Sequence, residues 1–159
     1  MDEAAITLPS FAKINLHLQV IGRRPDGFHD LCTVFQTISL HDTISVWPAD
    51  EILISCGDDK IPVGEQNLVV KAAVALREKA GVSHGARIHL DKRIPAPGGL
   101  GGGSSNAATA LLVLNTLWNL DIATDDLHAV AESLGSDVPF FLYGGTALGM
   151  GRGEIVEPI

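Results

Sequence analysis

Apolar and polar residues alternate strictly along residues 11–20, the first regular segment of the chain. A period of two residues is typical of a β-strand with one buried face, because successive side chains point to opposite faces of a sheet. We therefore expect a half-buried strand here. Its apolar face would carry Ala12, Ile14, Leu16, Leu18 and Val20, and its polar face Lys13, Asn15, His17 and Gln19.

Further strands are predicted after a turn. The tripeptide Pro25-Asp26-Gly27 predicts that turn, since proline fixes one backbone dihedral and glycine is free to take a positive φ. Residues 31–47 resume a β-rich pattern, and residues 51–55 and 86–91 predict two shorter strands.

Two segments have the spacing of helices. Apolar residues recur at helical intervals over residues 68–80, and Gly81 follows as a common C-terminal stop. Residues 104–120 are mostly apolar and open with two serines, which predicts a long helix.

The C-terminal part mixes both kinds of element. Residues 125–134 predict a helix that Thr124 caps and Gly135 ends. Residues 138–159 contain strand-like stretches interrupted by glycines. The order of elements predicts an α+β fold in one domain, without repeats or an interdomain linker.

Composition limits the possible partners. The 159 residues are 46% hydrophobic and 19% charged, which indicates a globular domain. A formal charge of -8 would repel phosphate backbones and anionic lipids, so we expect neither nucleic acid nor a membrane as partner. The start Met1-Asp2-Glu3 is acidic and no apolar run reaches the ~18 residues of a membrane span, which favours a soluble cytoplasmic protein. Cys32 and Cys56 form no CxxC pattern, so we expect reduced thiols.

A glycine-rich loop directly precedes the predicted helix at 104–120. Glycine lets backbone amides approach a ligand closely, and a helix N-terminus offers unpaired N–H groups with partial positive charge. The loop therefore predicts a phosphate site, against the alternative of a flexible loop that ends in a serine cap. Its residues are Pro95, Ala96, Pro97, Gly98, Gly99, Leu100, Gly101, Gly102, Gly103, Ser104 and Ser105.

Two common phosphate loops fit this sequence poorly. A Walker A loop ends in Gly-Lys-Ser or Gly-Lys-Thr, whereas Gly103 is followed by Ser104. A dinucleotide fingerprint that starts with Gly99 and Gly101 would need a third glycine at position 104, although Asp121 follows at about the spacing of a ribose-binding acid. P-loop ATPases and dinucleotide-dependent oxidoreductases are therefore disfavoured.

Residues 95–107 resemble the second motif of the GHMP superfamily, that of galactokinase, homoserine kinase, mevalonate kinase and phosphomevalonate kinase. Four further segments, in order along the chain, resemble the diphosphocytidyl-methylerythritol kinase family within it. Phe28 stands where that family usually has tyrosine, Pro97 stands where it has glycine, and the superfamily's third glycine-rich motif is absent. The four segments are Phe11-Ala12-Lys13-Ile14-Asn15-Leu16, Asp26-Gly27-Phe28-His29, Gln66-Asn67-Leu68 and Gly135-Ser136-Asp137-Val138-Pro139.

The resemblance implies a fold and an activity. The fold would be the GHMP kinase N-terminal domain, like domain 2 of ribosomal protein S5, with a mixed sheet packed with helices. The activity would be ATP- and Mg²⁺-dependent phosphorylation of the 2-hydroxyl of 4-diphosphocytidyl-2-C-methyl-D-erythritol, in the non-mevalonate isoprenoid pathway. Residues 1–159 would be the first of two domains, with the C-terminal domain absent from this chain. The alternatives are another GHMP kinase, of the homoserine or mevalonate type, and an inactive nucleotide-binding remnant.

The resemblance also implies roles for single residues. Asp137 would accept the proton of the substrate hydroxyl, and Lys13 would stabilise charge on the transferring phosphoryl group. Asn15 would position the substrate, while Phe28 and His29 would bind the cytosine base by stacking and hydrogen bonding.

Two further residues, Asn67 and Lys92, would line the adenine and ribose of ATP. Without the resemblance, the alternatives are a helix N-cap for Asn67, a surface charge for Lys92, a solvated lysine for Lys13 and a turn carboxylate for Asp137. No protein ligand for Mg²⁺ is indicated, and the histidines show no metal-binding spacing.

Overall fold

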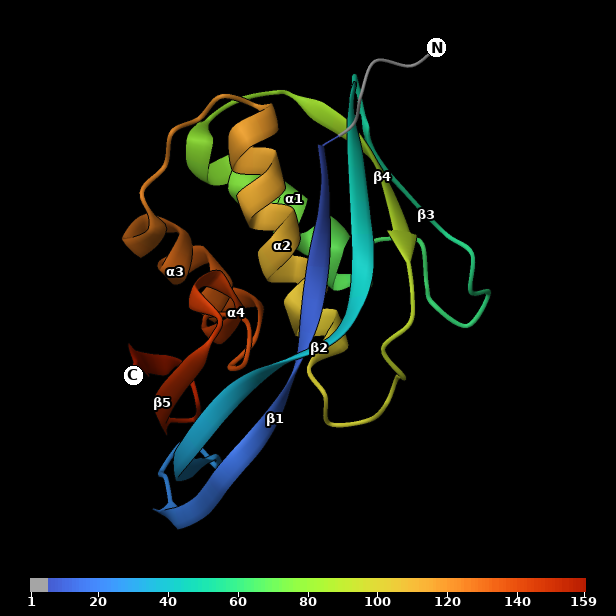
Figure 1. The fold of residues 1–159 in the computed structure, drawn as a ribbon. Helices are drawn as coiled ribbons and strands as arrows, with labels where there is room; N and C mark the ends of the chain where they lie inside the picture. The colour runs from blue at the N-terminus through green and yellow to red at the C-terminus, as the bar shows by residue number, and fades with distance from the viewer. Residues whose placement is uncertain (1–5) are drawn as a thin grey trace.

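The computed structural model describes residues 6–159, so the acidic start Met1-Asp2-Glu3 lies outside the described residues. Figure 1 shows a twisted sheet with the helices gathered on one of its faces. The fold is α+β with a mixed sheet, as predicted. The elements in chain order are β1 (Ile6–Arg23), β2 (His29–Ala49), β3 (Ile52–Cys56), α1 (Leu68–Ala80), β4 (Gly85–Asp91), α2 (Gly102–Leu117), α3 (Thr124–Leu134), α4 (Phe140–Tyr143), β5 (Thr146–Gly151) and β6 (Ile155–Pro158).

The sheet is organised around the long strand β2. The C-terminal half of β2 lies between β1 and β4, with Ile44 opposite Leu90. Its N-terminal half lies between β1 and β5, with Phe35 opposite Ala147. The strand β3 joins β4 in parallel and β6 joins β5 in antiparallel fashion. The resulting order is β3-β4-β2-β5-β6, with β1 along β2.

The main core lies between this sheet and the helices. Alternate residues of β2 and β4 supply its sheet side, because residues two apart on a strand share a face. The apolar faces of α1, α2 and α3 supply the other side. Its largest fully buried side chains are Ile44, Leu76, Ile88, Leu90, Leu111, Leu114 and Leu127.

A smaller core joins β2, α4 and β5. The rings of Phe35 and Phe140 stack with their centroids 4.8 Å apart, and both are almost fully buried. An ideal Cβ at Gly149 would lie 2.5 Å from Cε2 of Phe35, so the absence of a side chain there makes room for the ring. The aromatic pair therefore packs directly on the backbone of β5.

The first strand is longer than predicted and largely exposed in its second half. Leu16, Leu18 and Val20 are 61%, 57% and 58% exposed, so the prediction that they face the core is wrong. Beyond Ile14, β1 and the N-terminal half of β2 project as a ribbon that the helices do not cover (Figure 1), and β5 pairs with the other edge of β2. A register shift between Asn15 and His17 also interrupts the alternation.

The helix α1 agrees with the prediction at both ends, whereas α2 differs from it at both ends. The helix α1 ends as predicted at Gly81, which takes a φ of 65°. The helix α2 begins at Gly102, two residues before the expected serines, with Gly101 as its N-cap. It ends at Leu117 instead of residue 120, because the following turn places Asn119 and Asp121 in the left-handed region.

The C-terminal elements were predicted less well. The helix α3 begins after Ala123, which has no side-chain cap bond, so the predicted Thr124 cap is wrong: the helix already includes Thr124 as its first residue. Gly135 follows α3 as predicted. The short helix α4 was not foreseen. Both cysteines are free thiols, as predicted. No helix within residues 6–159 is both long and apolar enough to cross a membrane.

Candidate active site

Lys13 lies where three segments meet. Its backbone N–H donates to the carbonyl of Leu100 in the glycine loop at 2.9 Å. Its ammonium Nζ donates to Oδ1 of Asn15 at 2.7 Å and lies 3.5 Å from Oδ2 of Asp137. The Lys13 side chain is only 7% exposed, so the alternative of a solvated lysine is wrong. The structure thus brings Lys13, Asn15 and Asp137 together, as the sequence motifs predicted.

A chain of hydrogen bonds fixes Asn15. Its Nδ2 donates to Oγ1 of Thr33 at 2.6 Å, and that hydroxyl donates to the carbonyl oxygen of His17 at 2.7 Å. Because Thr33 accepts from the amide nitrogen, the amide oxygen of Asn15 points to Lys13. The orientation of Asn15 therefore follows from the pairing of β1 with β2.

Asp137 lies in the turn between α3 and α4. Its side chain is 37% exposed, so the carboxylate can meet both Lys13 and a ligand from outside. An ideal Cβ at Gly153 would lie 3.6 Å from Oδ1 of Asp137, which places the turn after β5 close to the carboxylate. Phe140, three residues after Asp137, anchors this turn in the small core.

The same small core supports the lysine. The Lys13 ammonium lies 5.4 Å from the centroid of the Phe35 ring, within cation–π range. Phe35 stacks in turn on Phe140. One aromatic pair therefore underlies both Lys13 and the turn that carries Asp137.

The glycine loop forms a hollow ahead of α2. Residues 95–104 line it together with Leu68, and its volume is about 200 Å³. Gly102, Gly103 and Ser104 belong to the first turn of the helix, where backbone N–H groups have no partner within the helix. These donors and the positive end of the helix dipole suit a phosphate group. The Ala96–Pro97 peptide bond in this loop is cis.

Ser105 departs from the predicted arrangement. It does not line the hollow of the glycine loop, and its hydroxyl is buried at 2.9 Å from Oγ of Ser10. The reason is the earlier start of α2, which turns the second serine inward.

Asn67 and Lys92, predicted to line adenine and ribose, both border a second hollow of about 170 Å³ beside the loop. Both also have partners within the protein. Asn67 caps α1 by accepting the Val69 N–H, and its Nδ2 donates to the Pro62 carbonyl. Lys92 pairs with the buried Asp42. Their role toward a nucleotide stays a prediction.

Phe28 and His29 border a third cavity, of about 350 Å³, beside the hairpin turn that joins β1 to β2. Phe28 is 53% exposed, so its ring is available to a ligand. The guanidinium of Arg152 lies 4.6 Å from the centroid of this ring. Ser136, next to Asp137 in sequence, also lines the cavity. The cavity therefore leads from the Phe28 ring toward the carboxylate.

The turn before Phe28 is held by charges. Asp26 accepts the Phe28 N–H at 3.0 Å and pairs with Arg24, which also pairs with Asp30. Partial desolvation of Asp26 acts to raise its pKa, but the Phe28 N–H and the Arg24 guanidinium outweigh that effect and lower the pKa of Asp26. The turn predicted at Pro25-Asp26-Gly27 is thus confirmed and positions the Phe28 ring.

Sequence reasoning missed Arg152, Thr33 and Phe35. Arg152 stands between Gly151 and Gly153, both with positive φ, and this flanking was taken only as loop punctuation. The backbone N–H of Arg152 donates to the Glu154 carboxylate at 2.6 Å, which fixes the turn. Within residues 6–159, no group of three or more acidic, histidine or cysteine side chains is placed to hold a metal ion.

Comparisons with known proteins agree with this geometry. The family model for the GHMP kinases N terminal domain matches residues 67–145. A protein of Chlorobium phaeobacteroides (strain BS1) named 4-diphosphocytidyl-2-C-methyl-D-erythritol kinase is 50% identical over 97% of this chain and 54% of its own length. A protein of the same name from Prosthecochloris aestuarii (strain DSM 271 / SK 413) is 47% identical over 98% of this chain and 54% of its own length. The chain thus spans about half the length of the curated relatives it matches.

Solved structures show the same fold. A crystal structure of 4-(cytidine 5'-diphospho)-2C-methyl-D-erythritol kinase superposes with a TM-score of 0.82 and 43% identity, over 97% of this chain and 55% of that chain. The Methanococcus jannaschii mevalonate kinase superposes with a TM-score of 0.76 over 100% of this chain and 57% of that chain, and its 14% identity shows the fold alone. By motif, topology and sequence identity, this chain belongs to the GHMP kinases and has the fold of their N-terminal domain.

Proposed function

We propose that this chain is the nucleotide-binding and catalytic first domain of a cytoplasmic kinase that transfers phosphate from ATP to the 2-hydroxyl of 4-diphosphocytidyl-2-C-methyl-D-erythritol. One observation carries the proposal. Lys13 bonds to the glycine loop through its backbone and contacts Asp137 through its ammonium, 3.5 Å away. A phosphate-binding loop and a carboxylate base therefore meet at one cation, which is the arrangement that phosphoryl transfer to an alcohol needs.

The donor would lie along the glycine loop. The first-turn amides of α2 would hold phosphate oxygens of ATP, and the adjoining hollow beside Asn67 and Lys92 would take the nucleoside. Mg²⁺ would accompany the nucleotide on its phosphates, since the ion prefers oxygen ligands and often relies on substrate phosphate.

The acceptor would enter from the cavity beside the β1–β2 hairpin turn. Its cytosine would stack on Phe28 with His29 at the polar edge of the base, and the guanidinium of Arg152 would attract the linking diphosphate. Ser136, the neighbour of Asp137 in sequence, also lines that cavity, so the acceptor hydroxyl would lie on this side of it. The aromatic ring of Phe28 in its wall favours a cytidyl substrate over homoserine and mevalonate, because these small acids have no base to stack on it.

The chain's own groups would then divide the chemistry. Asp137 would take the proton of the attacking hydroxyl. Lys13 would stabilise negative charge on the transferring phosphoryl group, and Asn15 would hold the lysine in place through its amide oxygen.

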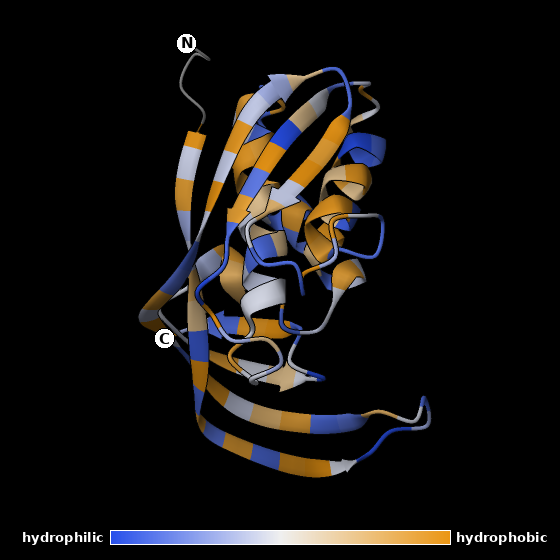
Figure 2. Cartoon of the chain, turned by 90° about the vertical axis from the view of Figure 1, so that its right-hand side faces the viewer, coloured by the Kyte–Doolittle hydropathy of each residue, from blue (hydrophilic) through white to orange (hydrophobic). Residues whose placement is uncertain are grey.

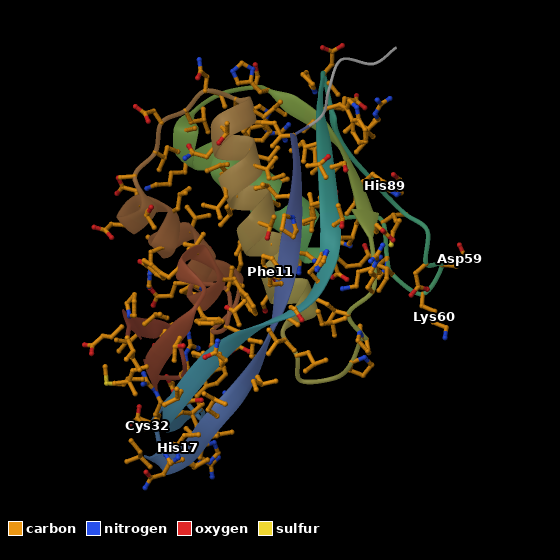
Figure 3. All side chains as sticks on the ribbon, viewed as in Figure 1. Phe11, His17, Cys32, Asp59, Lys60 and His89 are labelled. Carbon is orange, nitrogen blue, oxygen red and sulfur yellow. The ribbon has the colours of Figure 1, made fainter. Side chains whose placement is uncertain are left out.

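The test is phosphate transfer from ATP to the cytidyl substrate, with homoserine and mevalonate as competing acceptors. We would compare this chain, a version extended to the full length of its relatives, and an Asp137→Asn variant of each. Loss of a general base should lower kcat by about 10²–10⁴-fold. The control Asp59→Asn removes an exposed carboxylate in the loop after β3 (Figure 3), and should keep full activity.

The outcomes separate the parts of the proposal. Transfer to the cytidyl substrate in the extended protein alone would show that this domain needs its partner half. Transfer to homoserine or mevalonate instead would overturn the substrate assignment. Full activity of Asp137→Asn would overturn the role of the carboxylate.

A further inference from the structure

A buried polar cluster lies behind the glycine loop, and two of its members, Lys92 and Asn106, also line the hollow proposed for the nucleoside. We define this Asp42 cluster as Ser10, Asp42, Lys92, Ser105 and Asn106. Asp42 and Ser10 are completely buried, and the other three are nearly so. The members come from β1, β2, the segment after β4, and α2, so they are distant in sequence and joined by the fold.

The Asp42 carboxylate binds both ends of the glycine loop. Its Oδ1 accepts the backbone N–H groups of Arg93 and Ile94, at 2.6 and 2.8 Å, immediately before the loop. Its Oδ2 accepts Nδ2 of Asn106 at 2.9 Å, immediately after the loop, and Nζ of Lys92. A single side chain thus fixes how far apart the two ends of residues 95–105 lie.

The cluster also reaches the start of α2 and the strand that carries Lys13. Nδ2 of Asn106 donates to Oγ of Ser10 at 2.9 Å, and Ser10 bonds to Ser105 at 2.9 Å. Lys92 also donates to Oδ1 of Asn106 at 3.2 Å. An ideal Cβ at Gly102 would lie 3.1 Å from Nζ of Lys92, so the first residue of the helix packs directly on the cluster.

Fixed ends matter for a loop of this composition. Glycine loses more conformational freedom on ordering than any other residue, so a glycine-rich loop with free ends would lose much of that freedom when it closes on a ligand. Fixing the ends beforehand reduces this cost and raises affinity by preorganisation.

We propose that Asp42 is a positioning residue, whose carboxylate holds both ends of the glycine loop so that the loop amides are preorganised for the phosphates of a nucleotide. The choice of ligand rests on the proposed kinase function. The positioning of the loop does not, and can be measured without any ligand.

Two variants isolate the carboxylate. Asp42→Asn keeps an oxygen for the Arg93 and Ile94 amides but turns an amide toward Lys92 and Asn106, which are both donors. In the exchange variant Asp42→Asn/Asn106→Asp, the new carboxylate at 106 accepts from the new amide at 42 and from Lys92, so the link between positions 42 and 106 is rebuilt in reverse while the Lys92 bond to position 42 is not. The exposed Asp59→Asn serves as a charge-matched control.

Hydrogen exchange of single amides would show whether the loop has loosened. The N–H groups of Lys13 and Ser105 donate to loop carbonyls, those of Leu100 and Gly101. The N–H of Trp118 donates to Leu114 at the far end of α2 and reports on the stability of the helix as a whole. In Asp42→Asn we expect the first two amides to exchange at least about tenfold faster relative to Trp118, and the exchange variant to restore them.

Affinity for Mg²⁺-ADP, measured by calorimetry, is the second measurement. We expect about a tenfold loss in Asp42→Asn, where two of the carboxylate's hydrogen bonds are lost, and recovery in the exchange variant, where the bond between positions 42 and 106 is rebuilt. Equal acceleration of all three amides, or unchanged exchange and affinity, would overturn the proposal. If Asp42→Asn does not fold, the exchange variant alone decides. Fast exchange of the Lys13 and Ser105 amides in a folded exchange variant would then also overturn the proposal. Failure of the unmodified chain to bind ADP would count against the proposed function, while the exchange rates would still decide the role of Asp42.

Discussion

Gly101 is the residue at which the glycine loop meets the lysine. It takes a φ of 71°, and an ideal Cβ there would lie 2.6 Å from Cζ of Phe141 and 3.2 Å from Cγ of Lys13. Both backbone conformation and space therefore exclude a side chain. Gly99 has a similar φ of 68° but nothing within 4 Å of an ideal Cβ. A side chain at Gly99 therefore tests the cost of the left-handed backbone conformation without any steric clash.

We predict that Gly101→Ala destabilises the protein more than Gly99→Ala. The left-handed conformation costs a non-glycine residue about 1–2 kcal/mol, which both variants share. Overpacking against Phe141 should add about 1–3 kcal/mol in Gly101→Ala only. Urea unfolding of both variants measures the difference, and equal free energies of unfolding would show that the Phe141 ring moves away freely.

The sequence predicted some residues of the site and missed others. Lys13 and Asp137 were predicted together because each lies in a recognisable motif, and the structure places them in contact. Asp42 and Arg152 were missed, because their importance depends on partners brought near by the fold. Lys92 lies 50 positions from Asp42 along the chain, and no local pattern reveals such a pair.

At the scale of elements, one buried carboxylate connects β2, the segment after β4, and α2. Burial of Asp42 acts to raise its pKa, but the N–H of Ile94, the ammonium of Lys92 and the N–H of Arg93 outweigh burial and lower the pKa. A carboxyl with a lowered pKa in the folded state contributes stability above its ordinary pKa and loses it as pH falls through the folded pKa.

We therefore predict that part of the acid sensitivity of the fold comes from Asp42. The free energy of unfolding of the unmodified chain should fall more between pH 6 and pH 3 than that of Asp42→Asn, because the ordinary aspartate pKa is about 3.9 and the variant has no proton to bind there. Chemical unfolding at a series of pH values measures both slopes. Parallel slopes would contradict the prediction, and Asp59→Asn controls for the loss of one negative charge.

Elements themselves were predicted well where one pattern holds from end to end. The helix α1 satisfies both helical spacing and a glycine stop, and the structure confirms both. The strand β1 satisfies the two-residue period, yet the period does not reveal whether anything covers its apolar face. Register shifts after Phe11 and Asn15 also come from pairing with β2, which the sequence of β1 alone does not specify.

The whole molecule leaves an apolar face uncovered on the ribbon. Leu16, Leu18 and Val20 lie two residues apart and are each more than half exposed. Figure 2 shows hydrophobic and hydrophilic residues alternating along both strands of this projecting ribbon. Within residues 6–159, β1 pairs with β2 only, so its other edge also has unpaired backbone groups. Contiguous exposed apolar side chains and open strand edges both promote association.

We predict that this chain self-associates reversibly through the apolar face of the ribbon as its concentration rises. Leu18→Lys should weaken that association without loss of stability, because Leu18 is 57% exposed and a lysine there stays in water. His17→Lys is the matched control: it adds the same side chain to the adjacent position of the ribbon (Figure 3), on the opposite face of β1. Sedimentation velocity over a concentration series would measure the effect. Equal weakening by both lysines would assign association to the open strand edge, whereas a monomer at every concentration would contradict the prediction, because the exposed leucines would then be tolerated in water without a partner.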